Sequence, residues 1–169
     1  MAYDALTIAN AFIDISKKKP SETPLTPMKL LKLVYFAHGW HLGVKGTPLI
    51  NGPVEAWQYG PVIPDIYHAA KQFGNSAIVD KLKYPFGAPP DLASQGDNEV
   101  NSLVEWIWDE YGQLSGVALS NDTHLPGTPW STLVESFGNV RSVPRGTDIP
   151  EQLIREHFNE QYRRLIQAP

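Results

Sequence analysis

The sequence predicts a mainly α-helical, compact single-domain fold with one small β-hairpin. Apolar residues recur at helical spacing in several segments, and most of the fifteen prolines and thirteen glycines lie between those segments. One pair of short apolar runs flanks an Asn-Gly turn. At 169 residues and 42% hydrophobic content, the chain can fill one sizeable core as a single domain over residues 1–169. We expect the main body at about 4–137 and a C-terminal helix at about 149–166.

Two helices are predicted in the N-terminal quarter of the chain. Asp4 precedes a helical stripe that ends in three lysines before Pro20, where positive charge suits the negative end of the helix dipole. Thr26 followed by Pro27 is typical of a helix start, because the hydroxyl can cap free amides and proline tolerates the first turn. This second helix should run to about Val44, and its dense apolar positions predict a place near the middle of the fold.

The hairpin is predicted around Asn51-Gly52, because both residues tolerate the positive φ of a type I′ turn. Pro53 cannot donate a backbone hydrogen bond, which favours a short edge hairpin over a larger sheet. The flanking apolar residues are Leu49, Ile50, Val54, Ala56 and Trp57.

Shorter elements are predicted in the middle of the chain. Pro61 and Pro64 can begin a short helix that Gly74 ends. Residues 77–83 are expected to be extended, and 84–96, rich in proline and glycine, is expected to be a surface loop.

Further helices are predicted towards the C-terminus. Asp97 or Asn98 caps a helix that Gly112 closes, and Ser115 caps a short one. One or two helical turns are expected past Trp130. A capping-box spacing then starts an amphipathic C-terminal helix, which should pack on the domain; the residues that give this spacing are Asp148, Pro150 and Glu151.

Composition and charge argue against several functions. The 14 basic and 18 acidic residues give a net charge of −4, which disfavours direct nucleic-acid binding. Without cysteine the chain can form no disulfide and perform no thiol catalysis, in agreement with a reducing compartment. The N-terminus does not resemble a signal peptide, and no apolar run approaches the ~18 residues of a membrane span. We therefore expect a cytoplasmic protein with no membrane partner.

Two aromatic-rich segments, 28–64 and 111–130, are the most specific feature of the sequence. The first contains Met-Lys-Leu-Leu-Lys-Leu-Val-Tyr-Phe-Ala-His-Gly-Trp and ends in Glu-Ala-Trp-Gln-Tyr-Gly-Pro-Val-Ile-Pro at 55–64. The second contains Tyr111, Gly112, Leu114 and Ser115, followed by a Thr-His pair and a Pro-Trp pair at Thr123, His124, Pro129 and Trp130.

From about residue 6 to residue 130, this order resembles the SocA-like Panacea antitoxin family, also called GepA-like phage-associated proteins. The resemblance implies an antitoxin that binds and neutralises a cognate toxin protein. Large rings dominate both protein cores and binding hot spots, so both interpretations stay open for the aromatic side chains. The predicted partner-binding residues are Tyr35, His38, Trp40, Trp57, Tyr59, Gly60, Pro61, Thr123, His124 and Trp130.

Three alternatives stay open. A proteolytic adaptor would deliver the toxin to a protease, with loop 84–96 or the basic C-terminal end as its second contact. A phage-encoded inhibitor would bind a host protein that is not a toxin. The alternative of another class is a metal-dependent hydrolase, whose candidate residues are His38, His41, His68 and His124.

The enzyme alternative has little support in the motifs. His38 and His41 share a helix face, but a third metal ligand is missing nearby. The chain has no Gly-x-Ser-x-Gly elbow and no phosphate-binding glycine loop. We expect no enzyme activity, and therefore no catalytic, cofactor-binding or metal-binding residue.

Overall fold

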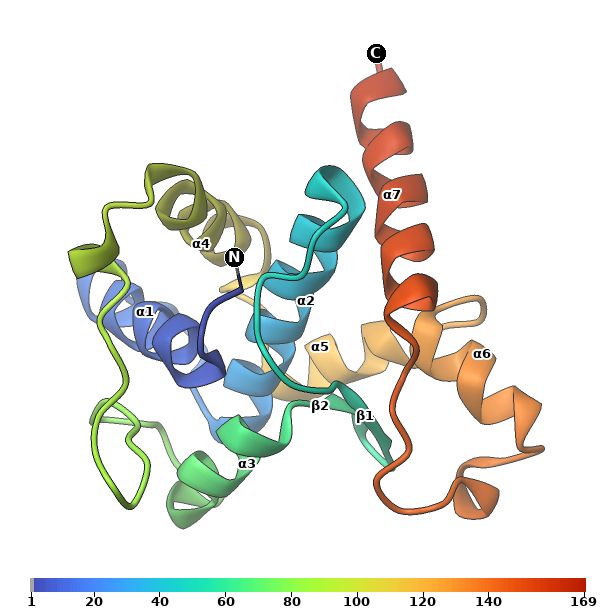
Figure 1. Cartoon of the computed structure of the whole chain (residues 1–169), viewed down its shortest axis with the longest axis horizontal. Coiled ribbons are helices and arrows are strands. Elements are labelled where there is room, and N and C mark those ends of the chain that lie inside the picture. Colours follow the sequence, from blue (N-terminus) through green and yellow to red (C-terminus); the bar gives the residue numbers. More distant parts are fainter. Residues whose placement is uncertain (1) are drawn as a thin grey trace.

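The computed structural model describes residues 2–169, and within them the fold is mainly α-helical with one small β-hairpin, as predicted (Figure 1). The helices are α1 (Ala5–Lys18), α2 (Pro27–Lys45), α3 (Pro64–Ala70), α4 (Asn98–Tyr111), α5 (Gly116–Thr123), α6 (Pro129–Ser136) and α7 (Glu151–Gln167). The strands are β1 (Glu55–Trp57) and β2 (Gly60–Val62). Three single-turn 3-10 helices lie at Lys71–Phe73, Ala93–Gln95 and Val140–Ser142.

Four of the predicted helix starts are confirmed by their capping contacts. The Asp4 carboxylate accepts the Leu6 N–H at 2.8 Å at the start of α1. Thr26, Asp97 and Ser115 accept backbone N–H groups in the same way at the starts of α2, α4 and α5. A side-chain oxygen at this position satisfies an amide that has no partner inside the helix.

The central helix is α2, which is buried on nearly all sides and contacts α1, α4, α5 and α7 (Figure 1). Helix α7 crosses it at two glycines. A Cβ at Gly39 would lie 2.2 Å from the Phe158 ring, and one at Gly43 would lie 2.5 Å from the Phe158 carbonyl carbon. Because Gly39 and Gly43 have no side chains, α7 can pack closely against α2, and Phe158 is 3% exposed.

The predicted capping box of α7 is wrong, although the helix begins where it was predicted. The N-cap is Pro150, and no side chain caps the first turn. Asp148 instead forms a β-bridge with Glu55 through the backbone, so this residue ties the linker to strand β1.

The predicted position of the hairpin is also wrong. Its turn is at Gln58-Tyr59, not at Asn51-Gly52, and β1 pairs with β2. Leu49 and Asn51 form backbone hydrogen bonds with Tyr3 at 2.7 and 2.8 Å instead.

Pro61 lies in strand β2, so Pro64 alone begins α3. Helix α6 begins at Pro129, before the predicted position past Trp130, because Thr128 caps it through a contact with the Ser131 N–H.

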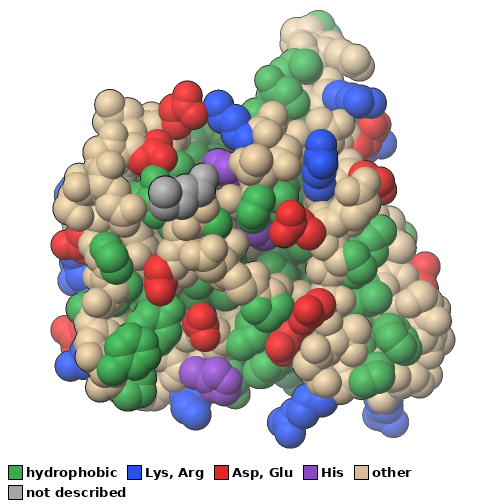
Figure 2. All heavy atoms as spheres, viewed as in Figure 1, with side chains coloured by type: hydrophobic (Ala, Val, Ile, Leu, Met, Phe, Trp, Pro, Cys, Tyr) green, Lys and Arg blue, Asp and Glu red, His purple; other side chains and the backbone are tan. Residues whose placement is uncertain are grey.

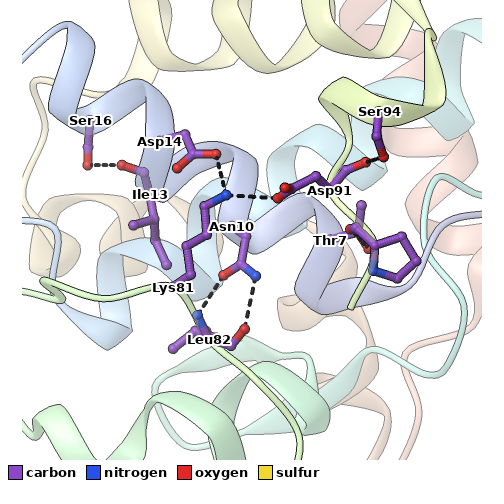
Figure 3. Close-up of polar contacts among 10 residues, drawn as sticks. Thr7, Asn10, Ile13, Asp14, Ser16, Lys81, Leu82, Asp91 and Ser94 are labelled. Carbon is purple, nitrogen blue, oxygen red and sulfur yellow. Dashed lines mark hydrogen bonds and ion pairs between the residues drawn. The ribbon is translucent and has the colours of Figure 1, made fainter. Parts of the chain in front are cut away.

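The segment between α3 and α4 lies along α1, and residues 77–83 form no strand within the described chain. Figure 3 shows how polar side chains of α1 hold this segment. Asn10 donates to the Leu82 carbonyl at 2.9 Å and accepts the Leu82 N–H at 2.7 Å. Lys81 Nζ lies 3.2 Å from Asp14 and 2.8 Å from Asp91. The loop over 84–96 that follows lies at the surface, as predicted, apart from the buried Leu92.

No helix within residues 2–169 is both long and apolar enough to span a membrane.

Candidate protein-binding site

The β-hairpin presents an exposed aromatic residue at its tip. Tyr59 is 61% exposed and stands beside the exposed Gln58 in the turn between β1 and β2. Gly60 follows with φ 108°, a backbone conformation that favours glycine. A Cβ at Gly60 would lie 2.6 Å from Thr123 Oγ1 and 3.2 Å from Lys32 Cε. Glycine is therefore needed here both for the turn and for the close approach of α2 and α5.

Four backbone carbonyl groups of the hairpin contact polar side chains from α2, α5 and α6 and from the turn after α5. The contacts are Trp130 Nε1 to the Trp57 oxygen at 2.7 Å, His124 Nε2 to the Gln58 oxygen at 3.2 Å, Ser120 Oγ to the Tyr59 oxygen at 2.7 Å and Lys32 Nζ to the Pro61 oxygen at 3.0 Å. Each contact gives a hairpin carbonyl a hydrogen-bond partner from outside the hairpin. The backbone of the tip is thus fixed from three sides while the Tyr59 side chain points to solvent.

His124 connects the two aromatic-rich segments. Its Nδ1 lies 2.6 Å from the Ser120 oxygen, and its ring lies 4.0 Å from the Trp130 ring between centroids. The two ring nitrogens therefore face the carbonyl oxygens of Ser120 and Gln58. Thr128 Oγ1 donates to the Thr123 carbonyl at 2.7 Å. The Thr-His and Pro-Trp signature therefore forms the support of the hairpin.

Two buried lysines on α2 are structural residues that the sequence analysis missed. Lys32 is 1% exposed, and burial lowers its pKa to about 8. Lys29, also buried, donates to Thr23 Oγ1 at 2.8 Å and to the Gly112 carbonyl, and burial lowers its pKa to about 8 as well. Their position inside a helix that is apolar on every face was the signal in the sequence, because no face was left to expose a charge.

The structure separates the ten predicted site residues into two groups. Seven gather at the hairpin: Trp57, Tyr59, Gly60, Pro61, Thr123, His124 and Trp130. Within this group Tyr59 is exposed and Trp57 and His124 are half-buried, whereas the other four are buried. A direct contact with a partner stays a prediction for each of them, and Tyr59, Trp57 and His124 are the ones that solvent reaches.

The other three lie further along α2 and are buried. The Tyr35 ring packs 5.9 Å from Phe158, and burial raises the pKa of its hydroxyl. Trp40 Nε1 donates to the Tyr111 hydroxyl at 2.9 Å. His38 Nδ1 accepts the N–H groups of two residues of the following segment, Leu49 and Ile50.

The histidine pair on α2 binds backbone groups. Burial, and to a lesser extent the neighbouring His41, lowers the pKa of His38 to about 4, so its ring is neutral at pH 7. His41 Nδ1 lies 2.7 Å from the Thr47 oxygen. Across residues 2–169, no three His, Asp or Glu side chains come together in a group that could hold a metal ion.

Comparison with known proteins identifies the family of the chain. Residues 30–131 match the model of the family described as "Antitoxin SocA-like, Panacea domain". The chain is 30% identical, over 161 residues, to the antitoxin SocA of Caulobacter vibrioides, with 94% of this chain and 84% of that protein covered. No solved structure matches the chain. The matched range contains the hairpin and every side chain that supports it, and the chain belongs to the SocA-like Panacea antitoxin family.

Proposed function

We propose that this chain acts in the cytoplasm as an antitoxin that neutralises a cognate toxin by direct binding at the hairpin tip. We name this region the tip surface, and it consists of Trp57, Gln58, Tyr59, His124 and Leu125. Family membership supports the general role. Neutralisation requires only that the toxin's active or target-binding surface is covered, for which a standard interface of ~1,600 Å² suffices. The proposal involves no catalytic step and no cofactor.

The observation that carries the proposal is the fixed display of Tyr59. A tyrosine offers a large ring and a polar hydroxyl, and such residues dominate the binding energy of many interfaces. Here the ring is 61% exposed, while Ser120 holds the carbonyl of the same residue at 2.7 Å. A backbone that is already ordered loses little conformational entropy when a partner binds.

Exposed apolar side chains lie within this surface and beside it. Leu125, beside His124, is 56% exposed, and Val117 on α5 is 63% exposed. Val117 lies one helical turn before Ser120, the residue that holds the tip. Exposed apolar residues around an aromatic anchor are typical of a protein interface.

The test uses the product of the adjacent gene as the candidate toxin. Its induction alone should arrest growth, and co-expression of this chain should restore growth and yield a complex that co-purifies. Tyr59→Ala should weaken the complex at least tenfold and abolish the rescue, as expected for an anchor residue. A harmless neighbour, or one that never binds, would contradict the antitoxin role. A Tyr59→Ala variant that binds as well as wild type would contradict the tip surface alone.

A second candidate function is the proteolytic adaptor, and the Phe86 turn favours it. Tyr84 and Gly87 exchange backbone hydrogen bonds at 2.9 and 3.1 Å, which closes a tight turn over Pro85 and Phe86. Phe86 is 88% exposed and stacks on Tyr84 at 5.0 Å. An adaptor needs a contact for the protease that is separate from its toxin contact, and this turn offers an ordered aromatic residue of that kind.

The two functions make different predictions for toxin turnover. If the chain is an adaptor, the toxin should disappear faster in cells that contain wild-type protein, and Phe86→Ala should slow this loss without weakening the toxin complex. Tyr59→Ala is the matched variant, because it should weaken the complex itself. A toxin that stays inhibited but is not degraded would exclude the adaptor.

A further inference from the structure

A hollow of about 550 Å³ lies beside the tip surface, between strand β1 and the segment that links α6 to α7. Its walls combine the indole of Trp57 and apolar residues of the linker with two arginines. In Figure 2, Lys and Arg side chains lie along the lower edge of the molecule, where this linker runs. The lining residues are Ala56, Trp57, Gln58, Val140, Arg141, Val143, Pro144, Arg145 and Gly146.

The charge of this hollow is not balanced from within. Arg141 and Arg145 are exposed, and no carboxylate is among the lining residues. Neither arginine has an ion-pair partner within the described chain. The adjoining elements carry the acidic residues Glu55, which accepts the Trp57 indole N–H at 2.7 Å, Asp148, whose backbone pairs with that of Glu55, Glu135 on α6 and Glu151 on α7. None of these four lines the hollow.

A second basic hollow, between α2 and α7, provides a comparison. It is lined by Lys45, Arg155 and Arg163 together with the carboxylate of Glu156. Lys45 also pairs with Glu99 at 3.0 Å. That hollow therefore contains its own negative charge, whereas the hollow beside the hairpin leaves both arginines free to bind an anion.

We infer that the hollow lined by Trp57, Arg141 and Arg145 binds an acidic segment of the toxin, one that carries an Asp or Glu side chain next to an apolar residue. A guanidinium group forms paired hydrogen bonds with a carboxylate, and such charge-assisted bonds are among the stronger ones at interfaces. The indole and the half-buried Val140 and Val143 offer an apolar wall to the neighbouring residue. The inference rests on the proposed antitoxin function and adds the chemistry that the partner must present.

The position of the hollow supports the toxin as its occupant. Trp57 and Gln58 belong both to the hollow and to the tip surface, so one partner seated on Tyr59 also reaches the arginines. The tip surface supplies an anchor, and the hollow supplies charge selection among toxins, because a basic segment would be repelled there.

The test compares two double charge reversals in the complex with the toxin. Arg141→Glu with Arg145→Glu should weaken the affinity at least tenfold, and Arg155→Glu with Arg163→Glu, which changes the net charge equally, should leave it within twofold. For the milder pair, Arg141→Gln with Arg145→Gln, the affinity for the toxin should depend less on salt concentration than it does for the wild type. Circular dichroism and thermal unfolding check that each variant is folded. If a pair of glutamate substitutions prevents folding, the same two arginines are replaced by glutamine instead.

The outcomes separate this inference from the proposed function. If wild-type protein binds the toxin, Tyr59→Ala weakens the complex and the Arg141/Arg145 variants bind as wild type, the acidic-segment inference is overturned and the antitoxin function stands. Equal losses from both double reversals overturn it too, because they reflect net charge alone. If wild type binds no toxin, both proposals fail. Light scattering that shows a dimer of this chain, dissociated by Arg141→Glu with Arg145→Glu, overturns the toxin as occupant.

Discussion

The hairpin and the α2–α7 contact are held by different forces. At the hairpin, polar side chains bind carbonyl oxygens at 2.7–3.2 Å, and the exposed ring of Tyr59 stands on the backbone that they fix. At the α2–α7 contact, Phe158 fills the space that Gly39 and Gly43 leave free. The first arrangement is directional and defines the geometry of a surface residue. The second buries apolar area and contributes mainly stability.

The expected energies differ accordingly. A hydrogen bond contributes about 1 kcal/mol net to folding, whereas truncation of a buried phenylalanine costs about 3–5 kcal/mol. Damage at α7 should therefore reduce stability most, and damage at the hairpin should affect partner binding more than stability. The variants below test this division, from the largest expected effect on stability to the smallest.

Phe158→Ala should lower the free energy of unfolding by about 3–5 kcal/mol, because it leaves a cavity against the two glycines of α2. Urea unfolding followed by circular dichroism measures the loss. Leu165→Ala on the same helix is the matched control, because Leu165 is 53% exposed and should change stability by less than about 0.5 kcal/mol. A small loss for Phe158→Ala would show that α7 is held elsewhere.

Gly60→Ala should cost about 2–3 kcal/mol. The positive φ strains any L side chain, and the new methyl group meets Thr123 Oγ1 at 2.6 Å. Gly52→Ala separates the two causes, because Gly52 has φ 89° but no atom within 4 Å of the new Cβ. Urea unfolding measures the loss of stability for each variant. Equal losses for the two would mean that the clash between the new methyl group and Thr123 on α5 adds nothing to the cost of Gly60→Ala.

The buried lysines predict a stability that rises with pH above neutrality. Native Lys32 loses its proton near pH 8, whereas in the unfolded chain the pKa is 10.5. Between these values the unfolded state binds more protons, so the free energy of unfolding increases by up to about 1.4 kcal/mol per pH unit for this residue. Lys29 acts in the same direction. Above pH 10 the raised pKa of Tyr3, about 12, has the opposite effect, because unfolded tyrosine ionises first.

Unfolding by urea between pH 8 and pH 10 checks this slope. Lys32→Met should reduce the slope, because only Lys29 then contributes, and Lys83→Met, at an exposed position, should not change it. A wild-type stability that is flat or falls over this range would contradict the buried, lowered-pKa state of the lysines.

Local sequence signals were sufficient for most of the helices. The caps of α1, α2, α4 and α5 depend on neighbouring residues. Thr26 and Ser115 were predicted as caps, Asp97 was one of two candidates, and Asp4 was predicted to precede the first helix. The predicted position of the hairpin was wrong because the actual backbone pairing around Asn51-Gly52 depends on partners that are distant in the sequence. Gly52 does adopt positive φ, but the residues before it pair with Tyr3, and Ala56 donates to the Thr147 carbonyl. No local pattern encodes such pairings.

The candidate site was predicted only in part, because its geometry also depends on contacts between residues that are distant in the sequence. Grouping by family signature identified the seven residues that the structure gathers at the hairpin, but not which of them are supports and which are exposed. Tyr35, His38 and Trp40 share a helix with Lys32, yet they lie away from the hairpin. Arg141 and Arg145 lie in an irregular linker without a motif, so only the folded chain places them beside Trp57.

Ser120→Ala provides the finest test of the division, because it leaves every exposed residue of the tip surface unchanged. The variant removes the hydrogen bond to the Tyr59 carbonyl and should cost about 1 kcal/mol of stability. If the fixed backbone prepares Tyr59 for the toxin, affinity should also fall by about three- to tenfold. Ser136→Ala is the matched control, because its hydroxyl binds the Leu133 carbonyl on the exposed side of α6. A loss of stability with unchanged affinity would show that the support of the hairpin serves folding alone, and that Tyr59 finds its partner without being held in place.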